Sequence, residues 1–168
     1  MKRYVDFMEM NLTVNHFVKL LIWILIFQLI GFSLGLLTQS NLHPWYESLN
    51  KSALTPPGFV FSIVWTILYV ILAFIAWTLW NKEKHIYSDS FRYLFALQML
   101  INWVWTPFFF QFHYLIFSAF LLMILIMINL ILMVKIRTTN KLVFSLLLPY
   151  IIWLVFAFYL NAVIALLN

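Results

Sequence analysis

Residues 59–80 read FVFSIVWTILYVILAFIAWTLW and contain no charged side chain. At a rise of about 1.5 Å per residue, a helix of this length crosses the roughly 30 Å of hydrocarbon in a bilayer. Five stretches of this kind are present, at residues 17–37, 59–80, 91–110, 115–134 and 142–167. Lipid offers no partner to an unpaired backbone group, so each stretch should be a helix. The sequence predicts an all-α integral membrane protein, a bundle of five transmembrane helices.

Composition leads to the same fold class. The chain has 168 residues, of which 65% are hydrophobic and 9% charged, whereas soluble domains average roughly 45–50% apolar and 25% charged. The short connections leave no room for a second domain, so we expect one membrane domain over residues 1–168. The net charge of +5 is attributed to basic residues that anchor helix ends, and nucleic acid is not expected as a partner. The chain has no cysteine, which excludes disulfides and thiolate chemistry.

The basic residues predict the orientation. With five spans, the N-terminus and the second and fourth connections lie on one side of the bilayer. Lys51 is the only basic residue on the other side, and the remaining nine of ten are Lys2, Arg3, Lys19, Lys82, Lys84, Arg92, Lys135, Arg137 and Lys141. Because Lys and Arg are retained in the cytoplasm, we expect a cytoplasmic N-terminus and an outer C-terminus, in a bacterial cell membrane.

The connection 38–58 is the only one long enough to fold over the bundle as a lid. It contains Trp45 and Tyr46, and it ends in Thr55-Pro56-Pro57-Gly58, directly before the second span. Consecutive prolines make this approach to the helix stiff. A stiff connection of this kind can form one wall of a binding site.

Aromatic side chains recur along one face of the second span. Phe61, Trp65 and Tyr69 are four residues apart, so a helix stacks them on the same side. They favour a wall of an intramembrane pocket. An interfacial aromatic belt with ordinary packing is the alternative reading of this segment.

The third and fifth spans carry matching faces. In the third span, Gln98 and Asn102 share a face with Trp105 and Phe109, and amides at membrane depth are disfavoured unless they face a partner or a cavity. Pro107 should bend this helix. The fifth span aligns its members at intervals of four residues: Pro149, Trp153, Ala157 and Asn161. The alternative is that the amides only join helices to one another.

Other chemistries lack their usual residues. His43 and His113 could in principle ligate haem iron, but no histidine lies within an apolar span and no pair has ligand spacing, so neither a metal site nor a cofactor is expected. All five acidic residues lie outside the spans, which disfavours hydrolysis and proton-coupled transport. Gly31 and Gly35 are four residues apart and predict close helix packing, either in a dimer or within the bundle.

Several motifs together resemble the TspO/MBR family, also called translocator protein or peripheral-type benzodiazepine receptor. They cover the chain from about His43 onward: Pro44-Trp45-Tyr46, Thr55-Pro56-Pro57, Phe61, Val64-Trp65, Leu68-Tyr69, Asn102-x-x-Trp105-Thr106-Pro107-x-Phe109-Phe110 and Pro149-Tyr150-x-x-Trp153-x-x-Phe156-Ala157-x-x-Leu160-Asn161. The resemblance implies a five-helix bundle, often a homodimer, that binds porphyrins such as protoporphyrin IX. In some members it implies sterol, isoquinoline or benzodiazepine ligands.

The resemblance also assigns residues. By position, Trp65 and Trp153 correspond to tryptophans associated with porphyrin photodegradation in bacterial relatives. Combined with the aromatic faces, the candidate ligand-binding set is Trp45, Tyr46, Pro56, Pro57, Phe61, Trp65, Tyr69, Asn102, Trp105, Phe109, Trp153 and Ala157. Three departures from the family pattern are Ser52-Ala53-Leu54 in place of Pro-Ser-Trp, Ala73 in place of a frequent glycine, and the absence of a basic residue after Tyr159.

Four functions are compatible with these residues. The leading hypothesis is a membrane receptor or sensor that binds a flat tetrapyrrole in an aromatic pocket. The second is a light-dependent porphyrin-degrading enzyme in which Trp65 and Trp153 are catalytic. The third is a porphyrin or sterol transporter. The fourth is a structural membrane protein without a small ligand.

Overall fold

The computed structural model describes the backbone of residues 2–81 and 89–168, and the side chains of 15–81 and 89–168. Its elements are α1 (Lys2–Ser40), η1 (Leu42–Tyr46), α2 (Gly58–Asn81), α3 (Asp89–Thr106), η2 (Pro107–Gln111), α4 (Leu115–Ile136) and α5 (Lys141–Leu167). Five helical segments are long and apolar enough to cross a bilayer. The predicted fold class, an all-α bundle of five transmembrane helices, is confirmed.

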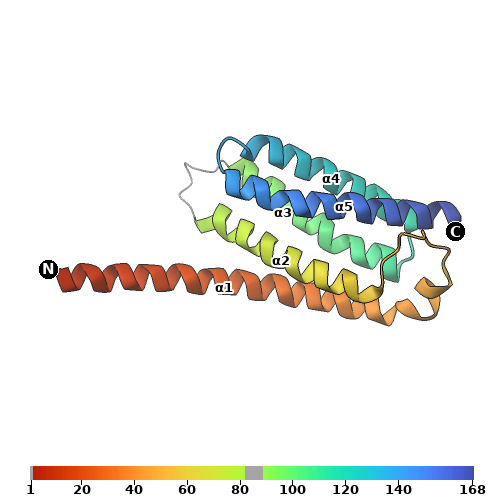
Figure 1. The fold of residues 1–168 in the computed structure, drawn as a ribbon, viewed down its shortest axis with the longest axis horizontal. Coiled ribbons are helices and arrows are strands. Elements are labelled where there is room, and N and C mark those ends of the chain that lie inside the picture. The colour runs from red at the N-terminus through yellow and green to blue at the C-terminus, as the bar shows by residue number, and fades with distance from the viewer. Residues whose placement is uncertain (1, 82–88) are drawn as a thin grey trace.

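The long helices lie side by side and alternate in direction (Figure 1). α1 packs mainly against α2, and α4 packs against both α3 and α5. The N-terminus and the turn between α4 and α5 lie at one end of the bundle, and the C-terminus and the connection 41–57 lie at the other. We call these the basic end and the lidded end.

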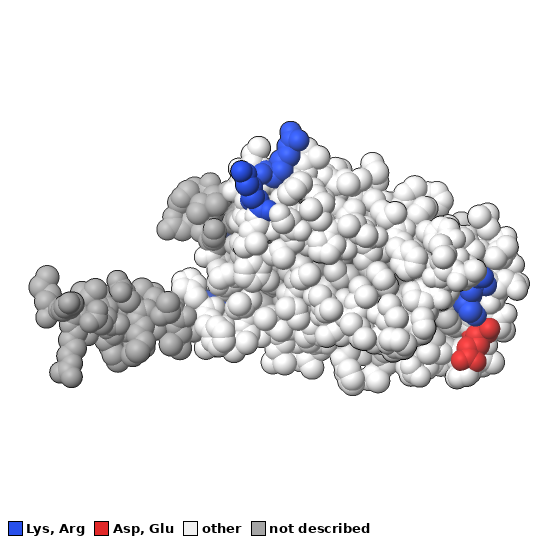
Figure 2. Space-filling view, viewed as in Figure 1, with Lys and Arg blue, Asp and Glu red and all other residues white. Residues whose placement is uncertain are grey.

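The first helix starts earlier than the sequence predicted. It begins at Lys2 instead of residue 17, because residues 2–16 contain neither glycine nor proline and nothing in them ends a helix. With η2 counted as the continuation of α3, which by itself ends at Thr106, the other four spans begin and end within two residues of the predicted positions. Figure 2 shows charged side chains near the ends of the molecule and uncharged surface between them. Lys82 and Lys84 lie outside the described residues.

A glycine allows two helices to approach closely, and a proline marks the place where a helix changes its geometry. A Cβ at Gly31 would lie 2.5 Å from the Tyr69 ring, whereas one at Gly35 would meet nothing within 4 Å. Gly31 therefore brings α1 close to α2 inside the bundle. The regular part of α3 ends directly before Pro107, where the π-helical turn η2 begins. This agrees with a change in helix geometry at Pro107, which has no N–H to donate.

Candidate ligand-binding site

The connection 41–57, which we call the lid, covers the lidded ends of α3 and α5. Trp45 packs edge-on against Phe109, with ring centroids 5.8 Å apart, and Tyr46 lies 5.5 Å from Phe110. Trp45 also stacks on His113, at 3.8 Å and 13°. Burial raises the pKa of the Tyr46 phenol above its ordinary value of 10.0. Tyr46 is therefore a neutral phenol at physiological pH.

Hydrogen bonds hold the lid in its shape. The Lys51 ammonium donates to the backbone carbonyls of Tyr46, Glu47 and Leu49, at 2.8, 3.1 and 3.0 Å. Its three N–H donors are thereby used inside the lid itself. Lys51 is a structural residue of the lid.

The lid is also attached to α5. The backbone N–H of Asn50 donates to the Asn168 side-chain oxygen at 2.9 Å, and the Asn168 amide nitrogen donates to the Asn50 carbonyl at 3.0 Å. The Ser52 and Tyr159 hydroxyls lie 2.9 Å apart. Ser52 begins the segment that departs from the family pattern, and Tyr159 here bonds the lid.

The aromatic stripe of α2 faces the bundle. Tyr69 is buried, Phe61 and Trp65 are half-buried, and Ile63 and Ile67 between them are exposed. This alternation places the stripe inward, as its spacing predicted. The Trp65 and Tyr69 rings lie 5.6 Å apart.

The stripe of α2 meets α5 at Trp153. The Phe61 ring packs edge-on against the Trp153 ring at 5.6 Å, and Ala157 is buried one turn further along α5. Pro56, at the end of the lid, is half-buried, while Pro57 is exposed. Pro57 is thus the one exposed member of the candidate set.

α3 and α5 are joined by one indole. The Trp105 ring stacks on Phe109 at 5.4 Å and 22°, and its N–H donates to the Asn161 side-chain oxygen at 3.1 Å. The Asn161 amide nitrogen in turn donates to the Leu115 carbonyl at 2.9 Å. Asn161 therefore fixes the indole of Trp105 and the start of α4 together.

A chain of hydrogen bonds runs below these rings through the centre of the bundle, and we call it the amide chain. The Tyr69 hydroxyl donates to the Asn102 oxygen at 3.1 Å, and the Asn102 amide donates to the Tyr150 hydroxyl at 3.0 Å. The Tyr150 hydroxyl donates to Gln98 at 2.9 Å, and the Asn129 amide donates to the same Gln98 oxygen at 3.3 Å. These five side chains connect α2, α3, α4 and α5.

The amide chain shows that both α3 amides join helices to one another. Gln98 is fully buried and bonds only Tyr150 and Asn129, so it joins helices. Asn102 contacts Tyr69 of the aromatic stripe and belongs to both the chain and the candidate site. Tyr150 and Asn129 had no place in the sequence-based site, although an asparagine at membrane depth is itself a signal of a buried partner.

One polar group at the site has no partner. The indole N–H of Trp153 is shielded from solvent and makes no hydrogen bond. The indoles of Trp77 and Trp103 share this property, but neither belongs to the candidate set. An unpaired buried donor is unfavourable by roughly 1–3 kcal/mol, so a ligand acceptor beside Trp153 would gain that free energy.

The histidines at the lidded end are used in local contacts. The His43 ring nitrogen lies 2.7 Å from the Glu47 carboxylate, and both side chains are exposed. His113 stacks on Trp45. Within the described residues, no group of three His, Cys, Asp or Glu side chains has the arrangement of a metal site.

The family model of the TspO/MBR family matches residues 18–167, the whole of the bundle described above. The chain belongs to the TspO/MBR family. This match, together with five long apolar helices, identifies an integral membrane protein and confirms the resemblance inferred from the aromatic and proline motifs.

Relatives from three kinds of organism match most of the TspO/MBR chain. "Tryptophan-rich protein TspO" of Archaeoglobus fulgidus is 31% identical over 151 residues, covering 89% of this chain and 97% of the relative. The protein of the same name from Chlorobaculum tepidum is 30% identical, covering 83% and 89%. "Translocator protein" of Sus scrofa is 30% identical, covering 79% and 85%. The similarity extends over nearly the full length of each relative.

Proposed function

We propose that this protein is a membrane receptor or sensor that binds a porphyrin of the protoporphyrin IX type at the lidded end of the bundle. The observation that carries the proposal is the gathering of aromatic side chains from the lid, α2, α3 and α5 at that end. Flat π-faces suit stacking against a planar macrocycle. The candidate ligand-binding residues are the twelve residues that the sequence assigned.

The site offers two kinds of contact to such a ligand. Half-buried rings such as Trp45, Trp65 and Trp153 supply apolar contact area. The Trp153 indole N–H, which has no partner, and the Tyr69–Asn102 pair supply polar groups. A site that is mostly aromatic with a few polar groups is typical of small-molecule recognition.

The central test is a protoporphyrin IX titration of the purified protein in nanodiscs, followed by tryptophan quenching and by porphyrin absorbance. Wild type should saturate, and Trp153→Ala should raise the Kd about tenfold, the scale of one lost aromatic contact. Trp77→Ala is the matched control, since Trp77 is also a half-buried indole with an unpartnered N–H. Its Kd should stay within about twofold of wild type. Non-saturable quenching, or equal losses in both variants, would exclude the proposed site.

Porphyrin photodegradation is a second candidate activity. It is favoured by the short distance between the Trp65 and Tyr69 rings, 5.6 Å, because a phenol beside an indole is a suitable electron donor. Illuminated protein with bound protoporphyrin IX should lose porphyrin absorbance, and the double variant Trp65→Phe, Trp153→Phe should bind but not degrade it. Equal loss of absorbance in wild type and the double variant would exclude catalysis by these residues.

Orientation and assembly are part of the proposal. We expect the N-terminus in the cytoplasm of a bacterial cell, because Lys135, Arg137 and Lys141 lie at the basic end. The chain lacks cysteine, so single cysteines report sidedness directly. In intact cells, an impermeant maleimide should label Ser48→Cys and leave Thr138→Cys unlabelled.

A homodimer is also expected. α1 has room for a second copy, because only 6% of its apolar stretch is buried, against 33% in each of the other helices.

A further inference from the structure

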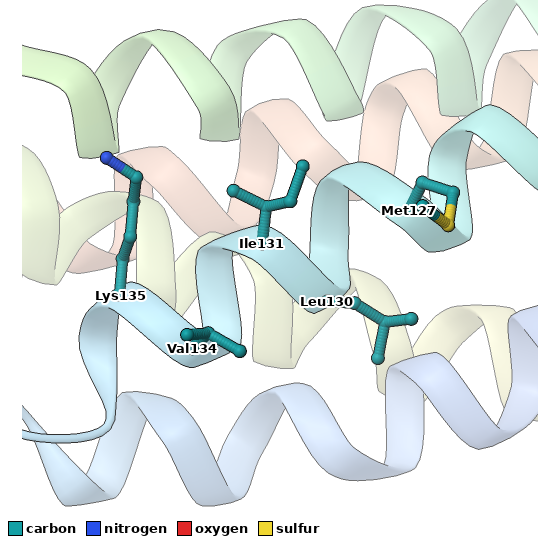
Figure 3. Close-up of a pocket in the computed structure, with 5 residues that line it drawn as sticks. All are labelled: Met127, Leu130, Ile131, Val134 and Lys135. Carbon is teal, nitrogen blue, oxygen red and sulfur yellow. The ribbon is translucent and has the colours of Figure 1, made fainter.

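The outer face of α4 carries a hollow that is separate from the lidded end. It has a volume of about 330 Å³ and is lined by Met127, Leu130, Ile131, Val134 and Lys135. Figure 3 shows Lys135 at one end of this row and Met127 at the other. All five side chains are exposed. Because α4 spans the bilayer, the apolar part of the hollow faces lipid.

The length of the hollow matches one lipid leaflet. Met127 and Lys135 are eight residues apart, which corresponds to about 12 Å along a helix. Half of the hydrocarbon thickness is about 15 Å. Lys135 lies one residue before the end of α4, at the interface. The hollow, which we call the α4 groove, is a shallow, open depression lined by α4 alone, and it runs from the headgroup region toward the middle of the membrane.

Positive charge gathers where the groove reaches the interface. Lys135, Arg137 and Lys141 are exposed, and none of them forms an ion pair with a described acidic residue. At the same end of the bundle, Asp89 is already paired with Arg92 at 3.1 Å. Figure 2 shows blue side chains close together near this end, whereas the blue at the opposite end lies next to red. An anion near Lys135 would meet positive charge that no described acidic residue compensates.

We propose that this groove binds one anionic phospholipid, with an acyl chain along Met127, Ile131 and Val134 and the phosphate beside Lys135. A neutral lipid would leave the cations without a counter-charge. A second copy of the chain, docked here with twofold symmetry, would bring like charges together. The chemistry of the site therefore selects a ligand that is apolar over one leaflet depth and negative at the surface.

A second hollow provides an internal comparison. It has a volume of about 320 Å³ and is lined by Val70, Ile71, Phe74, Leu142 and Leu146. No charged side chain lines it. It should accept acyl chains without preference for the headgroup.

The cysteine-free chain permits a direct test of the α4 groove. Ile131→Cys, labelled with bimane, is reconstituted in nanodiscs of neutral phosphatidylcholine that contain a tenth of brominated lipid. The brominated lipid is either phosphatidylglycerol or phosphatidylcholine. Brominated phosphatidylglycerol should quench the label more strongly than brominated phosphatidylcholine does. The difference should correspond to an enrichment of about fivefold beside the label, because one basic side chain attracts an anionic lipid by about 1 kcal/mol. Adding Lys135→Gln should lower the preference to what Arg137 and Lys141 alone provide.

The matched control is a label at Ile116→Cys, which is exposed on the same helix at the lidded end. This label should be quenched equally by the two lipids. Equal quenching at Ile131→Cys, an equal preference at both labels, or an undiminished preference in Lys135→Gln would overturn the proposal. If neither lipid quenches the label and copies crosslink through position 131, the face is a protein interface and the proposal is also wrong.

Discussion

The basic half and the lidded end of the bundle are built from different side chains. Toward the basic end, the core is mostly aliphatic and fully buried, and its members include Leu72, Leu79, Leu125, Leu132 and Ile136 beside the buried ring of Phe95. At the lidded end, a small buried cluster around Phe109 and Phe110 is surrounded by half-buried rings, and exposed hydrogen bonds hold the lid. Close aliphatic packing gives most of the stability of a helical bundle. Binding regions come from the less stable parts of a fold, which agrees with the ligand site that we propose at the lidded end.

The amide chain lies between these two regions. It ties α3 to α4 and α5 through Gln98 and reaches the candidate site through Asn102 and Tyr69. The amide chain is therefore the boundary between a scaffold, which is the mostly aliphatic core toward the basic end, and the candidate site at the lidded end.

The largest effect is expected at the contact between α1 and α2. Gly31→Ala places a methyl group 2.5 Å from the Tyr69 ring, which must move away from Asn102 or push α1 outward. We expect a loss of about 2 kcal/mol in the free energy of unfolding, measured in mild detergent. Gly35→Ala is the matched control and should change stability by less than about 0.5 kcal/mol, since its methyl group meets no atom within 4 Å. Equal effects of the two substitutions would contradict the α1–α2 packing.

A smaller loss of stability is expected from a substitution in the amide chain. Gln98→Leu removes the oxygen that accepts from Tyr150 and Asn129, and interhelical hydrogen bonds in membranes average about 0.6 kcal/mol each. The free energy of unfolding should therefore fall by about 1 kcal/mol. The Kd for protoporphyrin IX should stay within about twofold, because Gln98 lies outside the candidate site. A tenfold loss of affinity with unchanged stability would place Gln98 in the ligand site instead of the scaffold.

The fold could be predicted from sequence because each helix must be long and apolar enough to cross the bilayer. Apolar length and the sorting of basic residues already require five helices in alternating directions. The start of α1 at Lys2 was missed, since apolar length marks only the part of a helix that lies in lipid. Residues 2–16 continue the helix without an apolar signal.

The sequence predicted which helix faces line the candidate site, but it did not predict which side chains form hydrogen bonds between segments. Spacing placed Phe61, Trp65 and Tyr69 on one inward face, and the structure agrees. The contacts of Asn161 with Trp105 and of Asn168 with Asn50 join segments far apart in the chain. Periodicity within one helix contains no information about such pairs.

Within the site, Asn161→Leu should affect ligand binding as well as stability, because the Asn161 amide also donates to the Leu115 carbonyl. Asn161→Leu leaves the Trp105 N–H without its acceptor and frees the ring to turn away from Phe109. The Kd for protoporphyrin IX should rise about threefold to fivefold, in line with the loss of one ordered side chain. An unchanged Kd would remove Trp105 from the binding residues.

The most local effect is expected at the lid. Asn168→Ala removes two hydrogen bonds to Asn50, each worth about 0.5 kcal/mol at an exposed position. Amide hydrogen exchange across residues 47–55 should become about fivefold faster, while exchange in α4 stays unchanged. Gln111→Ala, also exposed at this end, is the control and should not alter lid exchange. Equal exchange in Asn168→Ala and wild type would mean that the lid is held by its other contacts.

The division into scaffold and site is tested most directly by fluorine NMR of protein labelled with 5-fluorotryptophan. The chain has eight tryptophans, and single Trp→Phe variants assign their signals. Saturating protoporphyrin IX should shift the signals of Trp45, Trp65, Trp105 and Trp153 and leave those of Trp77 and Trp80 in place. Shifts confined to Trp77 and Trp80, or spread equally over all eight signals, would contradict a porphyrin site at the lidded end.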